Sequence, residues 1–427
     1  MEKDFVKNNL AEHDQLEKAY QTDPDEFRAQ LDDALNSNPS SETLNVWRAR
    51  LSYQVLDTKR NVSLTQLLML CIAVGLLIKM YLLPFIDDEW FIPRYSLVIV
   101  IAGLIAYFML ASESIHRVVV IALLILLGCS IYVAFLPGPF FDSQIVNPTF
   151  YAPKDSQSVL MALIHLPLFA LSLLGISFMG ENWRSTDHRI AYVGYLGEML
   201  IYTLLILFGG AVLTLLTITL FSQIGLNIDD WYFNNIVVVG LATAPIVGTY
   251  LYDSIRHRER TFAPLLSNVF APLFLITVVV YLIATVTGGK SPFTDRDFLI
   301  TLNGLLLITL AITVFSISGK KGAGLSRLSD FINIGLLVAT LVLNTAALAA
   351  ILYRWADEGI TVNRVVVTGA NILIFLHLIS LLWTYIVQSK GSQDLGSLKR
   401  AVARYLPLYS AWSFVVLFVL PLIFNYQ

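Results

Sequence analysis

Residues 347–375 read ALAAILYRWADEGITVNRVVVTGANILIF, a short charged segment between two long apolar runs. Crossing the hydrocarbon core of a bilayer takes about 20 apolar residues in a helix, and the runs on both sides reach that length. The charged segment from Tyr353 to Arg364 therefore predicts a turn outside the membrane. Tyr353 and Trp355 are aromatic residues of the kind found at the membrane interface, and Gly359 suits the turn.

Similar apolar runs recur along the whole chain. Of its 427 residues, 56% are hydrophobic and 14% are charged, whereas soluble domains carry about 25% charged residues. Backbone groups in lipid must be hydrogen-bonded within their own segment, and the runs lack the alternation of barrel strands, so they predict helices. We therefore predict an all-α integral membrane protein with about eleven transmembrane helices, near residues 64–85, 95–112, 117–137, 158–179, 199–222, 234–253, 262–286, 298–318, 331–353, 365–388 and 403–424.

Lys and Arg gather in alternate connections between these runs. Residues 1–62 and the connections on the same side carry 21 of the 28 basic residues, while the opposite connections carry six. Because basic connections stay in the cytoplasm, we predict a cytoplasmic N-terminus and a C-terminus outside. Cys71 and Cys129 both lie inside apolar runs, so neither a disulfide framework nor a Cys-based metal site is expected.

The first 62 residues differ from the rest because they are polar and amphipathic. Phe27, Leu31 and Leu35 recur every four residues, and Leu44 and Trp47 share a face of a second helix. We predict a small cytoplasmic helical module at residues 1–62, followed by a polytopic transmembrane domain at residues 63–427. A core from about sixty residues is marginal, so the module is expected to pack on the membrane domain or on a protein partner. The alternative is a tail that only directs insertion.

Polar residues deep in the apolar runs are candidates for a binding pathway, since such groups are costly in lipid. Pro272 removes a backbone donor and frees the carbonyl of Asn268, and a broken helix of this kind is typical of transporter binding sites. The alternative is a set of side chains that only hydrogen-bond across helix contacts. The candidate polar pathway consists of His165, Asn268, Pro272, Asn344 and His377.

Helical spacing adds detail to this candidate pathway. Asn333, Thr340 and Asn344 recur at i, i+7 and i+11, which places them on one helix face. Carboxylates are absent at mid-depth, which weakens the hypothesis of an ion-coupled transporter. Glu198 and Asp253 lie near predicted cytoplasmic ends, where water or neighbouring arginines are expected to reach them.

Two acidic clusters follow the first and fifth predicted spans. Many-spanning glycosyltransferases that act on lipid-linked substrates use outer carboxylates to hold a divalent metal or to act as a base. Here the first outer connection is only about ten residues long, and acidic outer loops also arise when basic residues are kept inside. The outer acidic cluster consists of Asp87, Asp88, Glu89, Asp229 and Asp230.

Two further stretches carry the resemblance to a known family. LLSNVFAPLFLITVVVYLIATV at residues 265–286 and LYRWADEGITVNRVVV at residues 352–367 resemble the bacterial multi-pass inner-membrane proteins of domain-of-unknown-function family 4153. The resemblance covers roughly residues 160–390. It implies a bacterial inner (plasma) membrane location and this topology, and no activity. The family motif corresponds to a candidate outer-loop motif of Tyr353, Arg354, Gly359, Thr361, Asn363 and Arg364, either a binding motif or a locked hairpin.

Three hypotheses for function stay open. The first is a transporter-like or lipid-handling permease, and the second is a non-catalytic membrane scaffold or sensor that acts through residues 1–62. The third is an outward-facing lipid-linked transferase that uses the acidic clusters. Membrane lipids are expected partners, with a protein partner for the N-terminal module under the second hypothesis. No nucleic-acid partner, cofactor, metal or catalytic residue is predicted, since no phosphate-binding or hydrolase motif is present.

Overall fold

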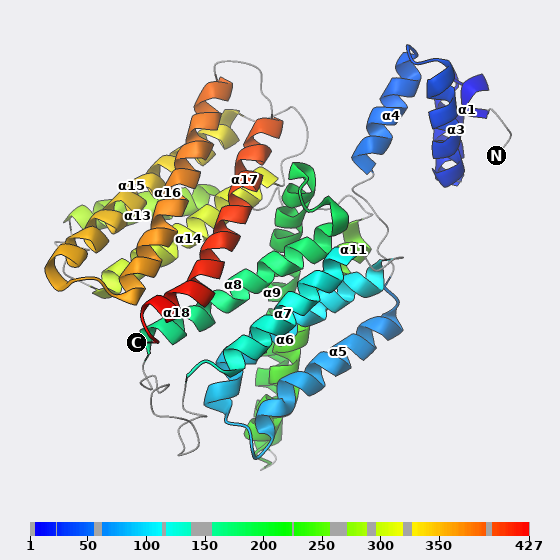
Figure 1. The fold of residues 1–427 in the computed structure, drawn as a ribbon. Helices are drawn as coiled ribbons and strands as arrows, with labels where there is room; N and C mark the ends of the chain where they lie inside the picture. The colour runs from blue at the N-terminus through cyan, green and yellow to red at the C-terminus, as the bar shows by residue number, and fades with distance from the viewer. Residues whose placement is uncertain are drawn as a thin grey trace. The chain divides into compact units, whose positions relative to one another are not determined.

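The computed structural model describes residues 5–22, 24–54, 62–112, 117–137, 156–223, 226–256, 271–287, 296–318, 327–389 and 395–426. Nearly all of these residues are helical, and none of them lies in a strand (Figure 1). The prediction of an all-α chain is therefore confirmed for the described residues. The chain divides into two compact units, Met1–Arg60 and Asn61–Gln427.

The first unit is a small helical module with a hydrophobic core of its own. It contains α1 (Phe5–Asn8), α2 (His13–Thr22), α3 (Pro24–Ser37) and α4 (Glu42–Gln54). The rings of Phe27 and Trp47 lie 4.8 Å apart, and the ring of Tyr20 lies 5.6 Å from Phe27. Such tilted aromatic pairs stabilise beyond their buried area. The buried members of this core are Val6, Leu16, Phe27, Leu31, Ala34, Leu35, Leu44, Trp47 and Leu51.

An ion pair on the surface of this module yields a modest prediction. Arg50 stacks over Trp47, with its guanidinium carbon 4.6 Å from the ring centroid, and its Nη2 donates to Oε1 of Glu17 at 2.8 Å. Both charged side chains are partly exposed, so Glu17→Gln should lower the opening free energy of the module by about 0.2–1 kcal/mol. Hydrogen exchange on the full chain measures this loss, which should shrink at high salt. The same substitution at exposed Glu12 is the control, and an equal loss there would refute the prediction.

The second unit holds the apolar helices. Among the described residues, nine helical segments are long and apolar enough to cross a membrane, together with two shorter apolar segments at Ala271–Val280 and Leu302–Ser318. The shorter segments lie in the seventh and eighth predicted spans. The helices of this unit are α5 (Leu64–Ile78), α6 (Asp88–Ala111), α7 (Arg117–Ala134), α8 (Gln157–Met179), α9 (Thr186–Gln223), α10 (Asp229–Tyr232), α11 (Val238–Arg256), α13 (Ala271–Thr287), α14 (Arg296–Ser318), α15 (Arg327–Glu358), α16 (Val362–Ser389), α17 (Leu395–Phe414) and α18 (Leu420–Ile423).

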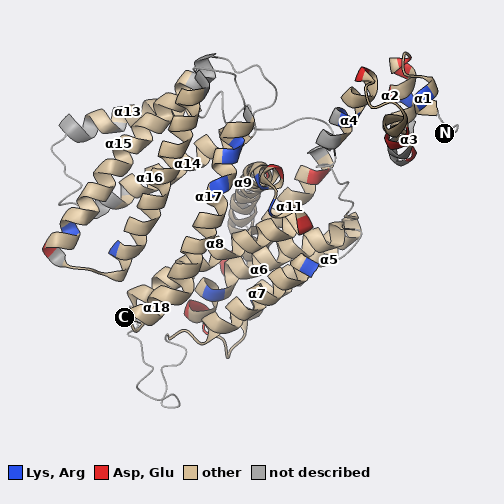
Figure 2. Cartoon of the chain, turned by 45° about the horizontal axis from the view of Figure 1, so that its top comes forward, with Lys and Arg blue, Asp and Glu red and all other residues tan. Residues whose placement is uncertain are grey.

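The outer surfaces of these helices are apolar. Leu76, Phe208 and Trp383 each expose about seven-tenths of their side chains. Figure 2 shows that α14, α15 and α16 carry no charged residue along most of their length. Large exposed apolar surfaces are unfavourable in water and are favourable in contact with lipid acyl chains. The surface and the helix lengths together fit a polytopic helical membrane protein.

Neighbouring helices approach each other closely at glycines, which have no side chain. A Cβ atom added to Gly248 of α11 would lie 2.8 Å from Oγ1 of Thr203 and 3.3 Å from the carbonyl oxygen of Met199, both on α9. A Cβ atom on Gly197 of α9 would lie 3.1 Å from the ring of Phe315 on α14. Small residues at such points let helix backbones approach closely in a membrane. Helix α9 therefore packs against both α11 and α14.

Candidate functional site

Helix α15 buries a polar face inside the second unit. Asn333 and Asn344 have no exposed side-chain surface, and Thr340 is buried between them. The spacing of 7 and 4 residues places all three on one side of the helix, as the sequence predicted. α15 packs against α13, α14 and α16, and the last two helices also bury polar residues.

An amide chain connects these helices. Nδ2 of Asn371 on α16 donates to Oδ1 of Asn303 on α14 at 2.8 Å. Nδ2 of Asn344 on α15 donates to the backbone carbonyl of Asn371 at 3.0 Å. The chain runs from half-exposed Asn303 to fully buried Asn344. Three helices thus meet through hydrogen bonds within their apolar segments.

Hydroxyl groups extend this polar region along α14 and α16. The hydroxyls of Thr309, Thr313 and Thr340 each donate to the carbonyl four residues earlier in their own helix, which satisfies them locally. Ser316 and Thr368 are buried without such a bond. We call the whole set the polar column; its members are Asn303, Thr309, Thr313, Ser316, Asn333, Thr340, Asn344, Thr368 and Asn371.

Several atoms of the polar column have no hydrogen-bond partner among the described residues. They are both amide atoms of Asn333, Oδ1 of Asn344, and the hydroxyls of Ser316 and Thr368. Each buried polar group without a partner costs about 1–3 kcal/mol, and a membrane offers no water to relieve that cost. The residues that carry these atoms lie on three helices, α14, α15 and α16, and α15 packs against both of the others. The polar column is therefore the strongest candidate site of the second unit.

The five residues of the predicted polar pathway do not converge. Asn344 belongs to the polar column, whereas His377 stacks on Tyr405 at 4.3 Å and contacts the hydroxyl of Tyr409 through Nδ1 at 3.0 Å. His377 follows Asn371 by six residues and so lies on another face of α16. Its contacts are with α17.

The other three members lie elsewhere. Nδ1 of His165 on α8 contacts the carbonyl of Met161 in its own helix at 2.9 Å. Pro272 is the second described residue of α13. Asn268 lies outside the described residues, so the expected broken turn before Pro272 stays a prediction.

The candidate outer-loop motif forms the turn between α15 and α16. Nη1 of Arg364 donates to the carbonyl of Gly359 at 2.6 Å, and Oγ1 of Thr361 accepts from the backbone N–H of Arg364 at 3.4 Å. Gly359 has a φ of +82°, which favours glycine. Tyr353 and Arg354 precede this turn at the end of α15, and Asn363 is the second residue of α16. The contacts described here hold the hairpin.

Gly359→Ala should therefore destabilise this turn by about 1 kcal/mol, because the added Cβ is strained at a positive φ. Hydrogen exchange in the last turn of α15 and the first turn of α16 would report the loss. Ile360→Ala removes an exposed side chain from the same turn and should leave exchange there unchanged. Equal protection in the two variants would contradict the assigned role of Gly359.

The residues of the outer acidic cluster lie at the N-termini of two helices. Oδ1 of Asp87 accepts from the backbone N–H of Trp90 at 3.3 Å and caps α6, while Asp88 and Glu89 lie in its first turn. Asp229 and Asp230 begin α10. Acidic residues are favourable at helix N-termini. No group of three His, Cys, Asp or Glu side chains placed to hold a metal occurs in the described part of the chain.

Sequence reasoning missed the burial of three charged residues. Arg94 on α6, Glu198 on α9 and Asp253 on α11 are all at least nine-tenths buried. The hydroxyl of Tyr107 donates to Oδ2 of Asp253 at 3.0 Å. Both side chains are therefore largely shielded from water, whereas the expected contact with neighbouring arginines stays a prediction.

Arg94 is the most buried of the three. Its guanidinium donates to the carbonyls of Trp90, Val133, Leu136 and Pro137 at 3.0–3.4 Å. The last carbonyls of a helix have no partner within it, so Arg94 satisfies the end of α7. A basic side chain near a helix C-terminus is also favourable for the helix dipole. Arg94 therefore joins α6 to α7.

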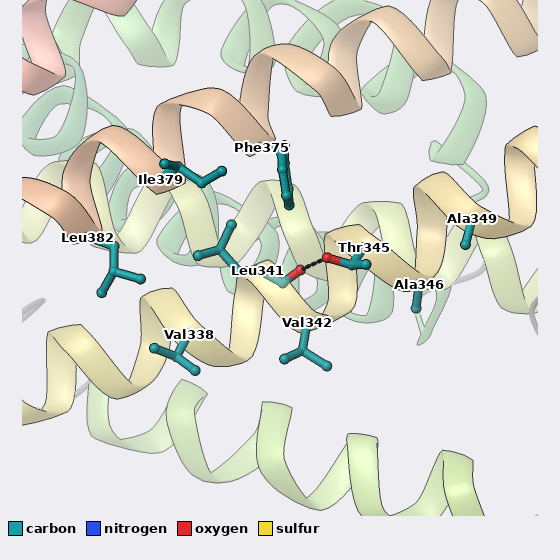
Figure 3. Close-up of a pocket in the computed structure, with 9 residues that line it drawn as sticks. All are labelled: Val338, Leu341, Val342, Thr345, Ala346, Ala349, Phe375, Ile379 and Leu382. Carbon is teal, nitrogen blue, oxygen red and sulfur yellow. Dashed lines mark hydrogen bonds between the residues drawn. The ribbon is translucent and has the colours of Figure 1, made fainter.

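A groove of about 650 Å³ lies along α15 and α16, away from the polar column. Figure 3 shows Val338, Leu341 and Val342 of α15 on one side and Phe375 and Ile379 of α16 on the other. Its one polar lining residue, Thr345, donates its hydroxyl to the carbonyl of Leu341 at 2.8 Å. The groove is therefore apolar, and its surroundings on both helices are exposed apolar side chains.

Fold and site together define the class of the chain, a helical membrane-type protein with an apolar exterior and a buried polar column. Comparisons with protein-family models, curated proteins and solved structures find no match to this chain. The resemblance to family 4153 therefore stays a prediction.

Proposed function

We propose that the chain is a transporter-like permease of the bacterial inner membrane, with the polar column as its solute pathway. The observation that carries the proposal is the hydrogen-bonded chain Asn303–Asn371–Asn344, together with buried atoms without a partner at Asn333 and Thr368 on two of the same helices. Polar groups inside membrane helices are expensive and are functional candidates by default. A permease uses such groups to replace the water that a solute loses.

The proposed topology has eleven spans, with α13 and α14 added to the nine longer segments. The distribution of Lys and Arg supports a cytoplasmic N-terminus and a C-terminus outside. In this topology the α15–α16 turn faces outward. Lipid acyl chains are the proposed partners of the exposed apolar surface, including the groove along α15 and α16, which also supports the lipid-handling form of the hypothesis.

The test is a reaction of single cysteines with a small neutral reagent, hydroxyethyl methanethiosulfonate. Cys71 and Cys129 are replaced by Ala, and Thr340→Cys is introduced as a reporter that leaves the amide chain intact. A pathway that opens to water should let this cysteine react about tenfold faster than one at Leu376, since lipid holds little of a polar reagent. Leu376 is 48% exposed on the apolar surface of α16 and serves as the matched control. Equal rates at the two positions would refute the pathway.

The scaffold or sensor hypothesis has one observation in its favour, the closed core of the N-terminal module. A module that folds by its own core is suited to bind a protein partner. Loss of a copurifying partner on deletion of residues 1–60, with cysteine reactivity unchanged, would support this second function. The transferase hypothesis gains no support from the cap positions of the acidic residues.

A further inference from the structure

We infer that the polar column takes a small uncharged solute that both donates and accepts hydrogen bonds, such as a polyol or an amide. The inference rests on the proposed permease function and names the substrate class of the same site. It follows from three features of the column: the absence of charge among its members, the mixture of its unpartnered donors and acceptors, and their separation along the helices.

The first feature is charge. Every member of the polar column is an amide or a hydroxyl residue. The buried charged residues of the described part of the chain are Arg94, Glu198 and Asp253, on α6, α9 and α11. An ion that enters the column would lose its water without meeting an opposite charge, which costs several kcal/mol for an isolated ion. A neutral solute has no such penalty.

The second feature is the chemistry of the atoms without a partner. Asn333 offers two N–H donors and one carbonyl acceptor, and Asn344 offers one further acceptor. The hydroxyls of Ser316 and Thr368 donate and accept. A metal cation would satisfy the oxygens and be repelled by the N–H groups of Asn333, whereas an anion would do the reverse. A hydroxyl or primary amide group of a solute can hydrogen-bond to both the donors and the acceptors.

The third feature is spacing. Asn333 and Asn344 are eleven residues apart, which is about 16 Å along α15. The self-bonded hydroxyls of Thr309, Thr313 and Thr340 belong to the same set of buried positions. The unpartnered atoms of Asn333 and Asn344 therefore form two separate stations. A solute with a few hydroxyl or amide groups can satisfy one station at a time.

The experiment uses the Thr340→Cys reporter in the full chain and three methanethiosulfonates of similar size. They carry a hydroxyethyl, an aminoethyl or a sulfonatoethyl group, and so are neutral, cationic and anionic. Each rate is divided by the rate of the same reagent at a cysteine placed at Ile360, which is 66% exposed in the α15–α16 turn. This ratio removes the intrinsic reactivity of each reagent.

The expected result is a normalised rate for the hydroxyethyl reagent about tenfold or more above those of both charged reagents, since each 1.4 kcal/mol of ion penalty gives a factor of ten. Charged reagents that react as fast as the neutral one would overturn the inference and leave the permease in place. A hydroxyethyl rate no higher than at Leu376→Cys would overturn the permease and the inference together. Asn371→Leu, which removes the donor to Asn303, should reduce the neutral rate and leave the rate at Ile360→Cys unchanged.

Discussion

Arg94→Ala is expected to lower the free energy of unfolding of the full chain by about 2–4 kcal/mol, because buried hydrogen bonds from a charged donor contribute about 1.5–3 kcal/mol and the variant leaves neutral carbonyls without that donor. The variant loses four hydrogen bonds to carbonyls and the contact with the ring of Trp90, whose centroid lies 5.4 Å from the guanidinium carbon. The carbonyl of Leu136 would then lose its donor, and the carbonyl of Val133 would keep only the 3.4 Å bond from the backbone N–H of Leu136. Buried carbonyls without a donor are costly, and lipid cannot replace the lost donor.

Thermal unfolding in detergent, followed by circular dichroism, measures this loss. Arg117→Ala is the matched control, because Arg117 is an exposed arginine at the start of α7. Arg94→Lys keeps the charge but lacks the planar fork that reaches several carbonyls at once, so it should recover only part of the stability. Comparable melting temperatures for Arg94→Ala and Arg117→Ala would show that the contact with α7 contributes little.

Asn333→Leu is expected to have the opposite sign. Both amide atoms of Asn333 are buried without a partner among the described residues, so replacement by an apolar side chain of similar size should stabilise the chain by about 1–3 kcal/mol. The same variant should slow the reaction of the Thr340→Cys reporter, because it removes a polar station. Substitutions at functional sites often increase stability while they reduce function.

Asn344→Leu provides the comparison for this prediction. Asn344 makes one hydrogen bond, to the carbonyl of Asn371, and leaves one acceptor unpaired, so its replacement should be nearly neutral for stability. Denaturant titration of both variants in the same detergent gives the two changes in unfolding free energy. A destabilised Asn333→Leu would refute the prediction that the buried amide of Asn333 lacks a partner.

The sequence predicted those features that each helix determines alone. Length and hydropathy are properties of a single segment, so the all-α fold and the apolar helices could be predicted without knowing any neighbour. The shared face of Asn333, Thr340 and Asn344 follows from helical periodicity in the same way. Helix α14 (Arg296–Ser318) covers the whole predicted run at 298–318, and α13 (Ala271–Thr287) covers the described part of the run at 262–286.

The features that depend on neighbouring helices could not be predicted. Asn303 and Asn371 meet only because α14, α15 and α16 pack together, and their spacing in the sequence gives no sign of it. The burial of Arg94 could not be predicted either, because its partners are backbone carbonyls, which every residue has. His377 was grouped with Asn344 by depth, whereas its face of α16 turns it toward α17.

The length of α9 has a mechanical consequence. Its 38 residues extend about 57 Å, while the hydrocarbon core of a bilayer is about 30 Å thick, so the helix must tilt or protrude. Its second half exposes large apolar side chains, such as Leu205, Leu213 and Leu216, to the surroundings. A thinner or thicker bilayer changes the preferred tilt of such a helix. Gly197 of α9 lies against Phe315 of α14, next to Ser316. We therefore expect a change in the tilt of α9, caused by a change in bilayer thickness, to shift α14 and the residues of the polar column on it.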